Sequence, residues 1–297
     1  MRIRLGTRES ALAMWQADTV AYQLRLAGHE VELVPITSEG DRVLDTPLPL
    51  MGGKGVFTKA LDDALLAGTI DIAVHSHKDI PTESVPGLTI GAVMEREDPR
   101  DALVVRKDLD FLSREDGLIA TGSPRRAGQW LHRHPHHHTT DLRGNVPTRL
   151  RKLRESDWDG AIFALAGLKR LGMEHHVAQV LDWMLPAPAQ GAVAVACRNG
   201  DAPVMEALSG LHHPQTAACV RAERAYLNRL NGGCSAPVGA LAEFVDGRIV
   251  LKGNILSLDG RDRYDIETEG SSDDPEAVGI EAAERILELG AGWLLGS

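Results

Sequence analysis

One cysteine stands in a setting that suits covalent chemistry. Cys234 lies in the run Asn231-Gly232-Gly233-Cys234-Ser235-Ala236-Pro237, directly after residues 216–230, whose apolar spacing predicts a helix. The Asn-Gly-Gly sequence is a helix-ending signal, and Pro237 prevents the helix from resuming. Cys234 is therefore expected on an accessible loop, where its thiol could anchor a ligand. The residues alone leave a second interpretation open, in which this cysteine is only a small buried hydrophobe.

The other two cysteines have the spacing of core residues. Cys197 shares the alternating face of an apolar strand with Val193 and Val195. Cys219 lies at helical spacing from Ala222 and Tyr226. Both are predicted to be buried, which leaves Cys234 as the candidate anchor.

A charged pair follows an apolar strand predicted over 70–74. The next residues are His75-Ser76-His77-Lys78-Asp79, and the carboxyl end of a strand is where an α/β sheet places its ligands. We therefore expect Ser76, Lys78 and Asp79 at a ligand-binding site. The alternative is that Lys78 and Asp79 form only a solvated ion pair.

The cations of this acidic chain are concentrated in one segment. The formal net charge is −10, yet residues 121–154 hold eight Arg or Lys residues and one acid, Asp141. Arg125 and Arg126 fall in the first turn of a predicted helix, where the macrodipole disfavours cations, so an anion should offset them. Arginine binds carboxylates through its planar fork. A single arginine could equally be a surface residue, but five such residues recur at strand ends and on helices: Arg125, Arg126, Arg143, Arg149 and Arg170.

The N-terminal region adds polar groups at the first strand-to-helix turn. Arg8 and Ser10 lie there, although Ser10 could serve only as a helix cap. Gly52-Gly53-Lys54-Gly55 lacks the spacing of a nucleotide phosphate loop and is predicted instead to present Lys54 from a mobile lid. Five histidines between His132 and His138 are predicted to form a solvated loop. No metal site is expected, because no acid or cysteine completes the set.

Composition limits the classes of protein. A chain of 297 residues with 43% hydrophobic residues can bury two or three cores. No apolar run approaches the ~20 residues that span a bilayer, and no signal peptide precedes the first strand, so a cytoplasmic protein is expected. Two other classes compete with an enzyme. An anion-binding regulator would explain the arginines, whereas a nucleic-acid binder is disfavoured by the negative charge and by aromatic residues of only 4%.

The periodicity predicts an α/β fold with two doubly wound domains, arranged as in a two-lobed binding protein, and a smaller C-terminal α+β domain. The expected domains are 1–95 with 191–210, then 99–187, then 214–297, with crossings at residues 95–101 and 185–191. The predicted strands are 3–5, 30–37, 70–74, 89–93, 102–105, 118–121, 139–143, 160–164, 192–197, 238–242, 248–257 and 262–267. The predicted helices include 12–26, 57–67, 216–230 and 275–295.

Seven segments, in order, also match a known family. They are Gly6-Thr7-Arg8-Glu9-Ser10, Gly52-Gly53-Lys54-Gly55, His75-Ser76-His77-Lys78-Asp79-Ile80-Pro81, Arg96-Glu97-Asp98-Pro99-Arg100-Asp101, Leu142-Arg143-Gly144-Asn145, Ala166-Gly167-Leu168-Lys169-Arg170-Leu171-Gly172 and Gly232-Gly233-Cys234. Over nearly its whole length the chain resembles the porphobilinogen deaminases, also called hydroxymethylbilane synthases.

The resemblance implies a transferase of tetrapyrrole biosynthesis with three domains, the first two like periplasmic binding proteins. Such an enzyme joins four porphobilinogens head to tail, with loss of ammonia, on a dipyrromethane cofactor that would be bound to Cys234 by a thioether. Asp79 would stabilise the cation that forms as ammonia leaves. The resemblance also implies a monomer that acts on a small molecule, with no nucleic-acid or membrane partner. The groups that would hold the cofactor and substrate are Arg8, Ser10, Lys54, Ser76, Lys78, Thr121, Ser123, Arg125, Arg126, Arg143, Gly144, Asn145, Arg149 and Arg170.

Four positions depart from residues common in that family. Gly122 replaces Ser or Thr, Pro124 replaces Leu, Ala189 replaces Gly, and Ala196 replaces Glu. None of them is a proposed catalytic group.

Overall fold

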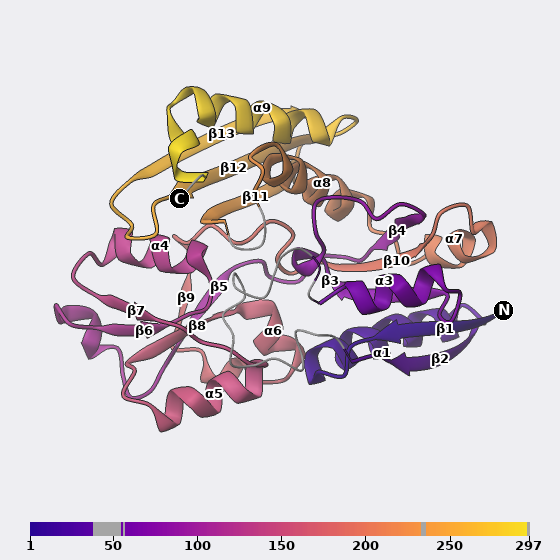
Figure 1. The fold of residues 1–297 in the computed structure, drawn as a ribbon, viewed down its shortest axis with the longest axis horizontal. Coiled ribbons are helices and arrows are strands. Elements are labelled where there is room, and N and C mark those ends of the chain that lie inside the picture. The colour runs from indigo at the N-terminus through magenta and orange to yellow at the C-terminus, as the bar shows by residue number, and fades with distance from the viewer. Residues whose placement is uncertain (38–54, 56, 233–235, 296–297) are drawn as a thin grey trace.

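The computed structural model describes residues 1–37, 55, 57–232 and 236–295, and it contains three β-sheets (Figure 1). The first sheet has the order β2-β1-β3-β10-β4, the second β7-β6-β8-β5-β9 and the third β11-β12-β13. In Figure 1 the third sheet and its helices lie above the other two. The predicted α/β class, with two similar units and a smaller α+β unit, is confirmed.

The first two sheets share one topology. In each, four strands run in one direction and the fourth in order runs antiparallel to both of its neighbours. The antiparallel strand of the first sheet is β10 (Val193–Arg198), which returns from the second unit, and that of the second sheet is β5 (Asp101–Val105), which arrives from the first. The chain thus crosses twice between the sheets.

Helices cover both faces of the first sheet. The central strands are apolar runs, and their side chains point alternately to one face and the other, so both faces are apolar. Ile72 and Val74 face α1 (Ala11–Leu26) and α7 (Ala202–Ser209), while Ala73 faces α3 (Lys59–Leu66). The remaining strands are β1 (Arg2–Thr7), β2 (Glu30–Pro35), β3 (Ile72–Ser76) and β4 (Leu88–Val93).

The second sheet is covered in the same way. Leu150 and Leu168 pack on one face from α5 (Val146–Glu155) and α6 (Leu165–Arg170), and Trp130 packs on the other from α4 (Pro124–Arg133). Its other strands are β6 (Leu118–Ala120), β7 (His138–Thr140), β8 (Gly160–Ala164) and β9 (Gln179–Leu181).

The third sheet is antiparallel and packs one face against two helices. Tyr226 of α8 (Pro214–Arg229) and Ile286 of α9 (Pro275–Glu288) are fully buried in this core. Its strands are β11 (Val238–Val245), β12 (Arg248–Leu256) and β13 (Arg263–Ser271). The predicted helix over 275–295 is wrong at its end, because Gly290 adopts a φ of 97° and residues 291–295 form a 3-10 turn.

Candidate active site

The described site residues lie near strand ends or helix starts, except Arg170, which is the last residue of α6. Ser76 is the last residue of β3, and Lys78 and Asp79 lie in the 3-10 turn His77–Asp79 that follows it. The predicted strand over 70–74 is therefore displaced by two residues, because Ile70 still hydrogen-bonds to Ala64 at the end of α3. Asp79 retains its predicted position just beyond a buried strand.

The second sheet presents its polar groups in the same manner. Ser123 precedes the first residue of α4, and its N–H donates to Thr121 Oγ1 at 3.2 Å. Asn145 caps α5 by accepting from the Thr148 N–H at 3.0 Å, and Gly144 before it has a φ of 112°. The Cβ of any other residue at Gly122 would lie 2.7 Å from the Leu142 carbonyl oxygen. That close approach explains why this chain has glycine there.

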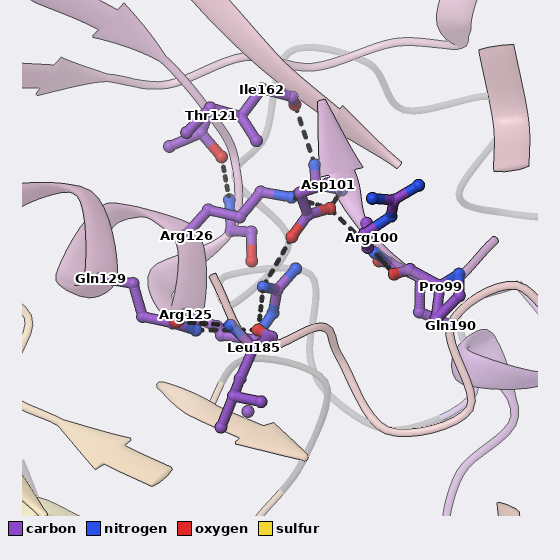
Figure 2. Close-up of polar contacts among 12 residues, drawn as sticks. Pro99, Arg100, Asp101, Thr121, Arg125, Arg126, Gln129, Ile162, Leu185 and Gln190 are labelled. Atoms are coloured by element: carbon purple, nitrogen blue, oxygen red, sulfur yellow. Dashed lines mark hydrogen bonds and ion pairs between the residues drawn. The ribbon is translucent and has the colours of Figure 1, made fainter. Parts of the chain in front are cut away.

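Arg125 and Arg126 converge on one internal carboxylate, that of Asp101 (Figure 2). Arg126 Nη2 donates to Asp101 Oδ1 at 2.7 Å, and Arg125 Nη1 lies 2.7 Å from Oδ2. Both arginines also donate to backbone carbonyls. Arg126 Nη1 donates to the Ile162 carbonyl at 2.9 Å, and Arg125 Nη1 donates to the Leu185 carbonyl at 2.6 Å. The anion expected beside this helix start is therefore supplied by the chain itself, at least in part. That these two arginines also bind substrate carboxylates stays a prediction.

Gln190 joins this cluster to the first sheet. Its Nε2 donates to Asp101 Oδ1 at 2.8 Å and to the Pro99 carbonyl at 2.7 Å, and its Oε1 accepts from Lys78 Nζ at 3.1 Å. Asp101 is the last residue of the first crossing and Gln190 lies at the end of the second, so both sheets meet here (Figure 2). The sequence analysis missed both residues. Their only signal was their place in segments interpreted as connectors.

The pKa values record a concentration of positive charge. Burial and nearby Arg126 lower the pKa of Lys78 to about 8, although Asp79 and Asp101 oppose the shift. Burial, with Arg126 and Arg143, lowers the pKa of Arg149 to about 10. Burial opposes ionisation of Asp101, but Arg125 and Arg126 outweigh it and hold the pKa of this carboxyl far below its usual value.

These shifts place residues of both sheets in one electrostatic neighbourhood. Among the described residues its five cations outnumber its three acids by two, and an excess of cations favours the binding of an anion. The cations are Lys78, Arg125, Arg126, Arg143 and Arg149, and the acids are Asp79, Asp101 and Asp141. A polycarboxylate such as dipyrromethane therefore fits the residues present.

Arg170, Arg8 and Ser10 have contacts of their own around this neighbourhood. Arg170 Nη2 donates to the Gly191 carbonyl at 2.7 Å, and its guanidinium lies 5.6 Å from the centre of the Trp15 ring. Arg8 stacks over Phe57 at 4.2 Å from its ring centre. Ser10 caps α1 by accepting from the Ala13 N–H at 3.3 Å, which is the structural role that the sequence analysis left open.

The cysteines can be compared only in part, since Cys234 and Lys54 lie outside the described residues. Cys197 and Cys219 are buried as predicted, with 0% and 6% of their surfaces exposed. Burial raises the pKa of Cys197, and it raises the pKa of Cys219 to about 11. Neither thiol is suited to act as a nucleophile, because the thiolate is the reactive form.

The histidine segment differs from the expected solvated loop. His137 is buried, and its ring lies 4.9 Å from that of His134 and 5.9 Å from that of Trp130. The apolar surface of Trp130 provides a partner for these rings that the sequence did not indicate. Within the described ranges, no three potential metal ligands lie together. Nor is any described helix both long and apolar enough to cross a bilayer.

Comparison with known proteins decides the family. The model named "Porphobilinogen deaminase, dipyromethane cofactor binding domain" matches residues 3–206, and that named "Porphobilinogen deaminase, C-terminal domain" matches residues 217–288. The chain belongs to the porphobilinogen deaminase family. This confirms the resemblance seen in the sequence, and with it the enzyme class and the dipyrromethane cofactor.

Individual members are similar over their whole length. The porphobilinogen deaminases of Syntrophotalea carbinolica and Moorella thermoacetica are each 45% identical, covering 99% of this chain and 95% and 96% of their own lengths. Among solved structures, a periplasmic substrate-binding protein of an ABC transporter from Coxiella burnetii is 16% identical. It covers 73% of this chain and 94% of its own, with a TM-score of 0.43.

Proposed function

We propose that this porphobilinogen deaminase joins four porphobilinogen molecules head to tail, releasing one ammonia for each, and then liberates hydroxymethylbilane. Full-length membership of the family supports the activity. The observation that carries the site is the meeting of Asp79 with the cations of both sheets. In the same proposal the enzyme is a cytoplasmic monomer without a nucleic-acid partner.

Asp79 is the proposed catalytic residue. Ammonia leaves porphobilinogen with the electron pair of the broken C–N bond, and the remaining pyrrole carries a delocalised positive charge. A fixed carboxylate stabilises that charge more in the transition state than in the ground state. Lys78 and the arginines nearby cannot replace it, since their charge has the wrong sign.

The remaining site residues bind and orient. When attached at Cys234, the dipyrromethane supplies the carbon to which the first substrate is joined. Arg143 and Arg149 would hold carboxylates through their forks, and Lys78 would do so as a point charge. Arg8, Ser10, Lys54, Ser76, Thr121, Ser123, Gly144, Asn145 and Arg170, together with the Arg125–Arg126 pair, complete the proposed binding set.

The mass of the intact protein and its turnover test this function. We expect the purified chain to carry the mass of two linked porphobilinogen units. Cys234→Ala should lose it, whereas the matched variant Cys219→Ala should keep it. Asp79→Asn should lower kcat by on the order of 10²–10³-fold, because one transition-state stabilising group is removed, and Asp79→Glu should retain part of the activity.

Two results would contradict the proposal. The bare polypeptide mass together with no consumption of porphobilinogen would make the chain an anion binder instead of this enzyme. An Asp79→Asn variant within a few-fold of wild type would place the chemistry elsewhere.

A further inference from the structure

The Asp79 carboxylate lies in a segment whose other residues are hydrogen-bonded to several elements. It makes no hydrogen bond or ion pair with another residue of the described ranges, which leaves it available to a ligand. The residues before it are held individually. Ser76 Oγ pairs with the Gln16 amide at 2.9 Å, the His77 N–H donates to the Ala192 carbonyl at 3.0 Å, and Lys78 Nζ donates to Gln190.

The residues after Asp79 are held by one side chain from the third unit. Arg224, on α8, donates from Nη1 to the Ile80 carbonyl at 2.8 Å and from Nη2 to the Pro81 carbonyl at 2.6 Å. Hydrogen bonds from a charged donor are about twice as strong as neutral ones, and a guanidinium can direct two of them at once. Arg224 thus fixes two consecutive peptide groups directly beyond the catalytic residue.

The segment His77–Pro81 is not closely packed on the side that faces α8. A cavity of about 570 Å³ lies between the first unit and α8, and its lining includes His77, Ile80, Pro81 and Arg224. Burial lowers the pKa of His77 well below its usual value, so this ring stays neutral beside the guanidinium. Space remains on that side, so the backbone here is held by the two hydrogen bonds from Arg224 and by the Ile80 N–H, which donates to the His77 carbonyl at 3.2 Å.

The helix that carries Arg224 also leads to the cofactor. The last residue of α8, Arg229, is five positions before Cys234. We propose that Arg224 is a positioning residue, which sets the distance and orientation of Asp79 relative to the helix from which the cofactor is attached. The inference rests on the proposed function. A displacement of about 1 Å at a reacting centre can cost ~10²-fold in rate.

The test compares substitutions on one helix. Arg224→Met keeps the length of the side chain and removes both donors, and Arg224→Lys keeps the charge without the fork. Arg221→Met is the matched control, because Arg221 also lies on α8 and beside the cavity but pairs with exposed Glu276. Each variant is checked for the covalent adduct by intact mass and for its fold by circular dichroism. Then kcat and KM for porphobilinogen are measured.

We expect kcat of Arg224→Met to fall by on the order of 10–100-fold with KM changed little, because Arg224 positions a catalytic group and is not placed to bind substrate. Arg224→Lys should lose severalfold in kcat, and Arg221→Met should match wild type. If Arg224→Met does not fold, Arg224→Lys decides. Wild-type kcat in the folded Arg224 variant overturns the inference.

A double-mutant cycle separates positioning from general destabilisation. If Arg224 acts through Asp79, Arg224→Met should cost little in the Asp79→Asn background, where the carboxylate is already lost. Equal fold-losses in both backgrounds would overturn the inference. Wild-type protein without adduct or turnover would instead overturn the proposed function, so the two failures are distinguishable.

Discussion

The Asp101 carboxylate is fully buried, and it determines where two arginines of the site can point. Arg125 and Arg126 are themselves almost fully buried, so each needs a compensating charge. The single negative charge of Asp101 is shared by both, so the trio keeps one net positive charge. This arrangement leaves their remaining N–H groups in fixed directions, as expected for a site that recognises carboxylates without rearranging.

Asp101→Asn should therefore destabilise the protein strongly. Removing one partner of a buried ion pair leaves uncompensated charge, which costs about 3–5 kcal/mol of unfolding free energy. Urea unfolding at pH 7 measures the change. The control is Asp182→Asn, because Asp182 pairs with Arg100 at an exposed site and should contribute almost nothing. Equal stability of wild type and Asp101→Asn would show that the pair is not needed.

The same carboxylate predicts a pH dependence. The pKa of Asp101 is lower in the folded chain than in the unfolded chain, so its contribution is complete above the unfolded value of ~3.9. It is lost as the pH falls through the folded pKa. Because the folded and unfolded pKa values both lie below about pH 4, the difference in unfolding free energy between wild type and Asp101→Asn should be constant from about pH 5 to 7. It should shrink below pH ~4. A difference unchanged at pH 3 would contradict this origin.

At the scale of elements, the spacing of apolar residues correctly predicted helices and strands that depend on contacts between near neighbours in sequence. The helix expected over 216–230 is observed as Pro214–Arg229, and Cys197 lies on the predicted face of its strand. The errors occur where tertiary contacts decide. β9 has three residues and is defined by pairing with β5, a partner about 78 positions away in sequence. For the same reason Asp101 and Gln190 could be placed near a site only once the crossings were known.

The second crossing contains an alanine in a left-handed backbone conformation, at a position where glycine is common in the family. Ala189 is buried with a φ of 63°, which favours glycine, the residue common there in the family. Its N–H donates to Glu223 Oε2 at 2.6 Å, and this bond retains the conformation. Gly191 follows with a φ of 88°, and a Cβ there would collide with the Glu97 carbonyl oxygen.

Ala189→Gly should stabilise the protein by about 1 kcal/mol, because it relieves a left-handed alanine at some cost in unfolded-chain entropy. Gly191→Ala is the opposite substitution in the same connector and should destabilise it. Chemical denaturation of both variants measures the two effects. A loss of stability in Ala189→Gly would mean that the left-handed conformation at this position does not strain alanine.

At the scale of the whole molecule, one carboxylate holds the third unit to both crossings. Glu223 of α8 is fully buried. It accepts from Arg96 Nη1 at 2.6 Å and Nη2 at 3.1 Å on the first crossing, and from the Ala189 N–H on the second. It also accepts from the Ala242 N–H of β11 at 2.8 Å. The helix that leads to Cys234 is thereby fixed to the segments that join the two sheets.

Glu223→Gln tests this junction. The amide presents N–H groups to donors and removes the charge that balances Arg96, so the buried guanidinium is left uncompensated, at a cost of about 3–5 kcal/mol. Because the lost contacts lie between units, we expect the thermal transition of the third unit to separate from the rest in calorimetry. The matched control, Glu276→Gln, removes an exposed partner of α8 and should leave a single transition at the wild-type temperature. A Glu223→Gln protein that unfolds in one step at that same temperature would show that the Glu223 carboxylate is not needed to hold the three units together.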